Sequence, residues 1–302
     1  MIALQKIAFI GFGEAAQAFL QGWRSYGNLS ARISAYDIKT ASADEHVASA
    51  KNADYAAWRV EGAGSAAEAV AGADAVFSVV TADQAHQAAL ATLPGLKLGA
   101  LFFDCDSCAP QTKALTAREV EATGALYVDV AVMAPVHPRL HRTPLLIGGP
   151  HAEFGAEVLR TLDMKPEIHQ GPVGAASAIK MIRSIMVKGL EALVCECVLA
   201  GEIAGVTDTV LDTLEDTYPG FGWRERSAYM LERVMTHGVR RAAEMREVAL
   251  TVDLLGLDGG MARATVDWQQ RVGNLKLKAK EIGPGDFHAL AGAILAKLPP
   301  KG

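Results

Sequence analysis

The sequence predicts an α/β N-terminal domain of the Rossmann type followed by an all-α C-terminal domain, with a long helix joining them. In the first half, short apolar runs alternate with alanine-rich helical patterns, which is typical of a parallel sheet covered on both faces. From Gly174 onward the strand-like runs vanish and helical patterns take over. Because 302 residues fit about two domains, we expect domains at residues 1–168 and 169–302.

The strands are predicted from β-branched and aromatic content and from the Gly, Asp or Ser residues that bound each run. In chain order they are "KIAFIG", "RISAYD", "DAVFSVVT", "ALFFDCDS", "ALYVDVAV" and "LLIGGP". The helical half opens with "AASAIKMIRSIMVKGLEALVCECVLAGEIAG", which is predicted to run as one helix. Pro and Gly predict breaks in the later helices near "TYPGFGW" and "EIGPGD".

Composition and charge exclude several function classes. A formal charge of -5, with 21% charged residues, leaves no basic surplus for a nucleic acid backbone. No apolar stretch reaches the roughly 18 residues that a membrane span needs, and the N-terminus lacks the features of a signal peptide. We therefore expect a cytoplasmic protein with neither nucleic acid nor membrane partners.

The cysteines do not predict a metal site. Only Cys105 and Cys108 form a CxxC pair, and no second pair stands at zinc-finger spacing. Cys195 and Cys197 are two residues apart in a helical segment, so they point in different directions. We expect free, buried thiols and no bound metal.

A glycine-rich turn near the N-terminus indicates a dinucleotide site. It follows a predicted strand, opens a helix, and precedes Asp37 at the end of the next strand by about 20 residues, which is the spacing of a dinucleotide fingerprint. Gly11 makes the tight turn, Gly13 lets the backbone approach a pyrophosphate, and Ala16 lets helix and strand pack closely. The alternative is an ordinary glycine turn. The residues assigned to the cofactor here are Gly11, Phe12, Gly13, Glu14, Ala15 and Ala16, together with Val80 and Thr81 at the end of the third predicted strand.

Two residues bear on the choice of cofactor. Asp37 is placed to accept a hydrogen bond from a ribose 2′-hydroxyl, and its charge would repel a 2′-phosphate. Lys39, two residues later, is a cation that could pair with that phosphate instead. We expect NAD, with NADP possible.

A polar stripe marks the long helix. Lys180, Arg183, Ser184, Lys188 and Glu191 fall within roughly -60° to +80° of one another around the helix axis, taking Lys180 as zero. The rest of the helix is apolar, and buried charges are costly unless they are paired or used. Because glycines deliver Lys180 into the first two turns, we expect it to transfer protons in a desolvated cleft. The alternative is a solvated face.

These residues carry a family resemblance over essentially the full chain. The chain resembles the β-hydroxyacid dehydrogenase family, which includes 3-hydroxyisobutyrate dehydrogenase and 6-phosphogluconate dehydrogenase. The glycine fingerprint matches at Gly11, Gly13 and Ala16, "DCDSCAP" is the counterpart of the family's Asp-x-Ser-[Ser/Thr]-x-x-Pro motif with Ser107 at its second hydroxyl position, and "GPVGAASAIK" matches the approach to the catalytic lysine. The resemblance implies that Lys180 is the general acid/base, that the long helix is the interdomain helix, and that the helical domain forms a homodimer.

Three departures place the chain in a divergent branch of that family. Ser184 stands where the family commonly has Asn, four residues after the lysine. Met133, Ala134 and Pro135 replace the substrate-gripping Ser-Gly-Gly. Arg240, Arg241 and Glu244 stand where many members have a Lys-Asp pair.

A basic loop, "PVHPRLHRTP", offers a replacement for the lost anion grip, because guanidinium forks suit planar anions. The alternative is a solvated loop. The residues assigned to an anionic substrate are Met133, His137, Arg139 and Arg142 in or next to this loop, Arg183 and Lys188 on the long helix, and His237 and Arg241 in the helical domain.

The function that follows is hydride transfer between a nicotinamide and a small 3-hydroxy acid, or the corresponding aldehyde or keto acid. Lys180 takes or returns the hydroxyl proton while Ser107 and Ser184 orient the reacting oxygen. Two alternatives stay open: an imine reductase of the same superfamily, against which the lysine counts, and a non-catalytic dimer that senses NAD.

Overall fold

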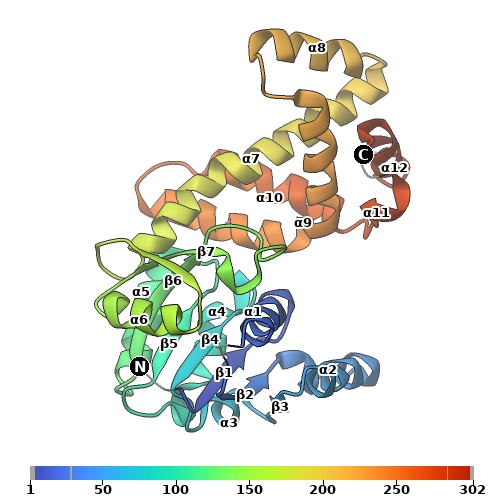
Figure 1. The fold of residues 1–302 in the computed structure, drawn as a ribbon. Coiled ribbons are helices and arrows are strands. Elements are labelled where there is room, and N and C mark those ends of the chain that lie inside the picture. The colour runs from blue at the N-terminus through green and yellow to red at the C-terminus, as the bar shows by residue number, and fades with distance from the viewer. Residues whose placement is uncertain (1–3, 28, 284, 300–302) are drawn as a thin grey trace. The chain divides into compact units, whose positions relative to one another are not determined.

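The chain folds into two compact units, residues 1–181 and 182–302 (Figure 1). The computed structural model describes residues 4–27, 29–283 and 285–299. The division falls inside helix α7, Ala175–Ala204, which begins in the first unit and continues in the second. The sequence analysis expects the first domain to end at residue 168, shortly before α7 begins.

The first unit is built on one eight-stranded sheet in the order β3-β2-β1-β4-β5-β6-β7-β8. The chain runs from β1 outward to β3, returns to the other side of β1 for β4, and then proceeds outward again. Ligands of such sheets bind where the strand order reverses, at the carboxyl ends of the strands, which here means beside β1 and β4. The strands are β1 Lys6–Ile10, β2 Arg32–Tyr36, β3 Glu61–Gly62, β4 Ala75–Ser78, β5 Leu101–Asp104, β6 Leu126–Val132, β7 Pro144–Gly148 and β8 Lys165–Ile168.

Helices cover both faces of the sheet, as Figure 1 shows. Alternate residues of β1 enter opposite cores: Ile7 and Phe9 pack with residues of α1 and α6, whereas Ala8 and Ile10 pack with residues of α3 and α5. This alternation explains why β1 is apolar throughout. The helices are α1 Glu14–Ser25, α2 Glu45–Ala57, α3 Ala66–Val70, α4 Ala85–Leu90, α5 Pro110–Glu121 and α6 Ala152–Thr161, with short 3₁₀ turns η1 Ile38–Ala41, η2 Ala82–Gln84, η3 Leu93–Gly95 and η4 Leu140–Arg142.

The sheet differs from the predicted one at its edges. All six predicted strands are present, but β7 runs antiparallel to β6, because residues 133–143 return the chain without the crossover helix that a parallel pair needs. Strands β3 and β8 were not predicted. The segment "KPEI" of β8 lacks a strand pattern, and its proline is tolerated because β8 is an edge strand.

The second unit is entirely helical in its described part. The remaining helices are α8 Thr207–Thr217, α9 Trp223–Leu254, α10 Gly260–Gly273, α11 Ala279–Ile282 and α12 Phe287–Leu295. The single long helix and the break at "TYPGFGW" are confirmed; the break at "EIGPGD" includes Pro284, which lies outside the described residues. Helices α9 and α10 approach closely where a Cβ on Gly238 would lie 2.3 Å from the carbonyl oxygen of Gln269. Within the described part of the chain, no helix has both the length and the apolar character to cross a membrane.

Candidate active site

The glycine turn after β1 has the geometry of a phosphate-binding loop. Gly11 has φ +83°, and a Cβ there would lie 2.8 Å from the carbonyl oxygen of Val79, so the turn requires glycine. A Cβ on Gly13 would meet nothing within 4 Å, which leaves open space where a cofactor phosphate would lie. Ala16 is fully buried against the sheet. Phe12 is also fully buried, so its side chain belongs to the core and not to the cofactor site.

The start of α1 fits an anionic group. Gly13 is its N-cap and supplies no side-chain hydrogen bond to the first turn, so these N–H groups are available to a pyrophosphate. Glu14 and Ala15 follow in the first turn, and the Glu14 side chain is exposed. The residues present therefore fit a dinucleotide.

Asp37 is fixed at the end of β2 by backbone donors. Its Oδ2 accepts from the Phe12 N–H at 2.9 Å, and its Oδ1 accepts from the Lys39 N–H at 3.0 Å. The Lys39 side chain is exposed. The sequence analysis missed Lys51, a buried residue of α2 whose Nζ donates to the Phe12 carbonyl oxygen at 2.9 Å. Lys51 thus fixes the glycine loop through the carbonyl oxygen of Phe12.

The end of β4 is hydrogen-bonded to the "DCDSCAP" segment, which follows β5. Asp106 is buried, and its carboxyl accepts from the Val80 N–H and from the Ser78 hydroxyl, both at 2.6 Å. Burial, reinforced by the nearby charge of Asp104, raises the pKa of Asp106 well above its usual range. Thr81, the next residue after Val80, is exposed. Asp106 therefore connects Val80, one of the predicted cofactor residues, to the segment that contains Ser107.

Lys180 and Ser107 are brought together. Lys180 Nζ donates to Ser107 Oγ at 2.7 Å, although the two residues are 73 positions apart. The contact depends on Gly174, which has φ +96° and would place a Cβ 2.8 Å from the Pro110 carbonyl oxygen. The "DCDSCAP" and "GPVGAASAIK" segments thus pack directly against each other.

A buried charge network fixes both segments. Lys113 is fully buried on α5; its Nζ lies 2.7 Å from Asp104 Oδ1 and 3.7 Å from Asp129 Oδ1. Asp129 in turn accepts from the Gly174 N–H at 3.0 Å and from the Ser177 hydroxyl at 2.6 Å. The beginning of α7 is therefore anchored to the sheet, and Lys180 projects from an anchored helix. None of these partners was predicted.

The basic loop is only partly available to a substrate. The Arg142 guanidinium pairs with Asp163 and lies 4.0 Å from the centroid of the Tyr26 ring. This pairing holds the pKa of the Asp163 carboxyl at about 2. By contrast, His137 and Arg139 are exposed, and Met133 is half-buried.

In the second unit, the polar stripe of α7 is largely buried against α9. Lys188 Nζ lies 2.7 Å from Glu244 Oε2, and Glu191 pairs with Arg241; all four side chains are buried. Arg183, by contrast, is exposed, as expected for a residue on a solvated face of the helix.

His237 also lies on α9 and is half-buried. Burial, followed by the neighbouring arginine charges, lowers its pKa to about 4, so the imidazole is neutral at pH 7.

Comparison with protein families shows to which family this chain belongs. Residues 6–162 match the model described as the NAD binding domain of 6-phosphogluconate dehydrogenase, and residues 202–272 match a domain of unknown function, DUF1932. The chain belongs to the β-hydroxyacid dehydrogenase family. It is a divergent member, its first unit binds NAD(P), and it is an oxidoreductase.

Solved structures agree with this placement. A conserved hypothetical protein from Sinorhizobium meliloti 1021 is 36% identical, with 97% of each chain covered and a TM-score of 0.71. A conserved protein of unknown function, described as structurally similar to 3-hydroxyacid dehydrogenases, is 25% identical over 91% of this chain and 99% of its own, with a TM-score of 0.64. Mycobacterium tuberculosis 3-hydroxyisobutyrate dehydrogenase shares the fold at a TM-score of 0.67 and 16% identity, with 97% and 99% covered.

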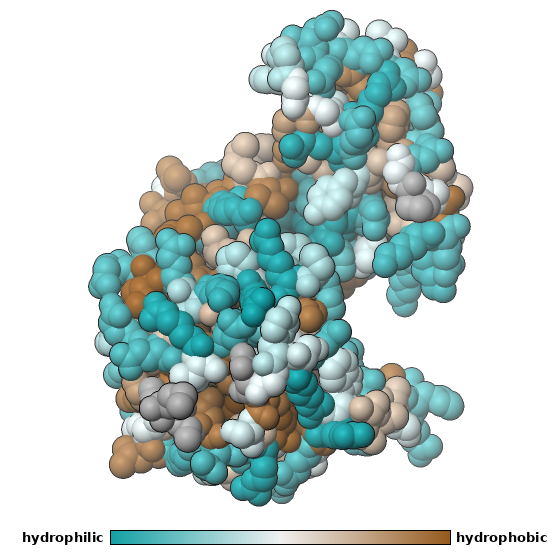
Figure 2. Space-filling view, viewed as in Figure 1, coloured by the Kyte–Doolittle hydropathy of each residue, from teal (hydrophilic) through white to brown (hydrophobic). Residues whose placement is uncertain are grey.

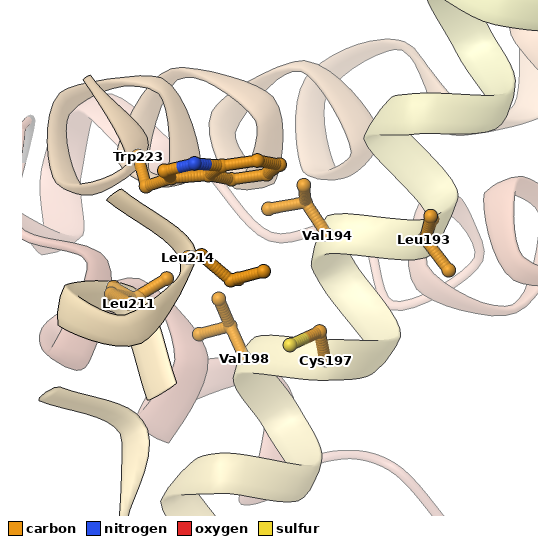
Figure 3. Close-up of a pocket in the computed structure, with 7 residues that line it drawn as sticks. All are labelled: Leu193, Val194, Cys197, Val198, Leu211, Leu214 and Trp223. Carbon is orange, nitrogen blue, oxygen red and sulfur yellow. The ribbon is translucent and has the colours of Figure 1, made fainter. Parts of the chain in front are cut away.

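This dehydrogenase family member also has an apolar pocket of 240 Å³ in its helical unit (Figure 3). The lining residues come from α7, α8 and the start of α9: Leu193, Val194, Cys197, Val198, Leu211, Leu214 and Trp223. Cys197 is its one titratable group, and burial raises the pKa of that thiol. The pocket therefore supplies no acid or base for oxidoreductase chemistry. The other three cysteines are buried and form no disulfide.

Proposed function

We propose that this oxidoreductase acts on small 3-hydroxy acids, or on the corresponding aldehydes or keto acids, with Lys180 as its general acid/base. The observation that carries the proposal is the 2.7 Å hydrogen bond between Lys180 Nζ and Ser107 Oγ. This pair lies in the unit that holds the glycine loop, and the chain's membership of the β-hydroxyacid dehydrogenase family supports the substrate class.

Each residue has a role in the proposed reaction. The glycine loop and Asp37 would hold the dinucleotide, which would supply the hydride acceptor or donor at its nicotinamide. Lys180 Nζ takes the hydroxyl proton during oxidation and gives it back during reduction. Ser107 already hydrogen-bonds Nζ, so it can pass a hydrogen bond on to the same substrate oxygen. Ser184, one turn further along α7, is the second proposed donor.

The anionic end of the substrate needs a cation that is not already paired. Arg139 and Arg183 are exposed, whereas Arg142 is paired with Asp163 and Arg241 with Glu191. We propose Arg139, with His137 beside it, as the first candidates for the carboxylate. Arg142 requires displacement of Asp163 before it can bind an anion.

The test is a panel of small 3-hydroxy acids oxidised by the purified protein with NAD or NADP, followed by the corresponding aldehydes in the reverse direction. Turnover of at least one hydroxy acid, at a rate well above that of an unrelated alcohol, is expected. Cofactor binding together with reduction of cyclic imines, and no hydroxy acid turnover, would assign the imine reductase activity instead. Cofactor binding without any turnover would favour the sensor.

The position of Asp37 predicts a preference for NAD. An Asp37→Ser variant should raise the ratio of kcat/KM for NADP to that for NAD by about tenfold or more, because a repulsion worth at least about 1.4 kcal/mol is removed. Asp44→Ser is a matched control, since Asp44 caps α2 in the way that Asp37 caps η1. An unchanged ratio in Asp37→Ser would remove this residue from cofactor selection.

We further propose that the protein forms a homodimer through its helical unit. Ile182, Met186 and Leu193 lie on one face of α7 and are 50%, 71% and 58% exposed, and Figure 2 shows hydrophobic residues along this helix. Met186→Glu should convert the dimer to a monomer in light scattering. Leu98→Glu, at an apolar residue of the first unit that is 84% exposed, should leave the dimer intact. A monomeric wild-type protein would refute the proposal.

A further inference from the structure

Lys51 is a buried lysine whose ammonium group contacts the backbone of the glycine loop. It lies on α2 and is 7% exposed, and its Nζ donates to the Phe12 carbonyl oxygen at 2.9 Å. The same Nζ lies 2.7 Å from Asp54 Oδ2, so the buried charge has a counterion three residues along the helix. Gln17 Nε2 is a second donor to the Phe12 oxygen, at the longer distance of 3.4 Å. The Phe12 carbonyl is therefore fixed mainly by a charged donor.

The peptide bond between Phe12 and Gly13 determines where the Gly13 N–H points. This bond is trans, so its carbonyl and its N–H point in nearly opposite directions. Because Lys51 holds the carbonyl, the Gly13 N–H is directed away from the ammonium group. A Cβ on Gly13 would meet nothing within 4 Å, and no hydrogen bond among the described residues uses the Gly13 N–H. An N–H that is held in place beside open space at the start of a helix suits an anionic ligand.

We propose that Lys51 is a positioning residue for the cofactor, which orients the Gly13 N–H as a donor to the pyrophosphate. The preceding peptide is fixed separately, because Asp37 accepts from the Phe12 N–H at 2.9 Å. Lys51 also polarises the Phe12 carbonyl, which strengthens the N–H of the same peptide as a donor. The inference concerns the binding of NAD(P) by the first unit, so it goes beyond the proposed reaction and does not depend on its substrate or on Lys180.

Calorimetric titration with three ligands tests the proposal: the preferred dinucleotide, ADP and adenosine. Lys51→Met should raise the Kd of the dinucleotide and of ADP on the order of tenfold, the usual contribution of a hydrogen bond to a charged group, and should change the Kd of adenosine less than about twofold. ADP carries two phosphates and adenosine carries none, so this difference assigns the effect to the pyrophosphate. Lys51→Arg keeps a charged donor and should recover most of the affinity.

Lys6 supplies a matched control. It is 9% exposed, and its Nζ also donates to a backbone carbonyl, that of Ala71, at 2.8 Å. It begins β1, whereas the glycine loop follows the end of that strand. Lys6→Met should therefore lose stability, as Lys51→Met does, yet leave the Kd of all three ligands unchanged. Thermal unfolding without ligand measures the stability of each variant.

Two results would overturn the inference. An equal loss of affinity for adenosine and ADP in Lys51→Met would show that Lys51 supports the loop as a whole and not the Gly13 N–H. An unchanged Kd for the dinucleotide would show that Lys51 plays no part in cofactor binding. Lys51→Gln replaces Lys51→Met if the latter does not fold; its shorter, neutral amide cannot hold the carbonyl as the ammonium does, so the same selective loss for ADP is expected.

Discussion

A Lys180→Met variant is expected to bind cofactor like the wild type and to lose turnover by about 10²- to 10⁴-fold, the usual contribution of a positioned general acid or base. Methionine keeps the length of the side chain but can neither accept nor donate the hydroxyl proton. Asp37 is held by the Phe12 and Lys39 N–H groups and Val80 by Asp106, so cofactor affinity should be retained. Cofactor fluorescence titration and steady-state kinetics measure the two quantities separately.

Two comparisons sharpen this result. Lys97→Met removes an equal charge from the first unit, but Lys97 pairs with Asp74, next to the amino ends of β1 and β4 and away from the glycine loop. It should leave turnover within about twofold, since exposed ion pairs contribute little. Ser107→Ala should lose less than Lys180→Met, because it removes an orienting hydrogen bond and not the proton acceptor. Near-normal turnover by Lys180→Met would exclude Lys180 as the acid/base.

The sequence predicts the centre of the fold better than its edges. Strands β1, β4 and β5 are apolar because helices cover both of their faces, so their pattern is unambiguous. At the edge of the sheet, β8 is the charged, proline-containing segment "KPEI", and its pairing with β7 comes from tertiary contacts that a local pattern does not record. The antiparallel direction of β7 could have been inferred from the short connection that precedes it.

The residues of the candidate site also differ in how well the sequence predicts them. Gly11, Gly13 and Asp37 follow a fixed local spacing, and their geometry is visible in the sequence. The roles of Lys51 and Asp129 could not be predicted from the sequence, because each side chain contacts a backbone atom 39 or more positions away. Ser184 and Lys188 are four residues apart on one helix, so their spacing alone could have indicated that they contact each other. Glu244, the partner of Lys188, lies on another helix and required the structure.

A Lys113→Met variant is expected to lower the free energy of unfolding by about 3–5 kcal/mol, because it leaves buried carboxylates without their cation. Lys113 is fully buried, and its charge faces both Asp104 and Asp129. Asp104 also accepts a hydrogen bond from the Tyr127 hydroxyl at 2.5 Å, so the carboxylate cannot turn toward water without breaking a second buried contact. Urea unfolding followed by circular dichroism measures the loss.

The same substitution links stability to the site. Asp129 holds the first residues of α7, so an uncompensated charge there should loosen the helix that carries Lys180. Lys165→Met, which breaks an exposed pair with Asp163, is the matched control and should cost about 0–1 kcal/mol. Adding Asp104→Asn to Lys113→Met should recover part of the lost stability, because one of the stranded charges is removed. A loss no larger than that of Lys165→Met would show that the network is not what anchors α7.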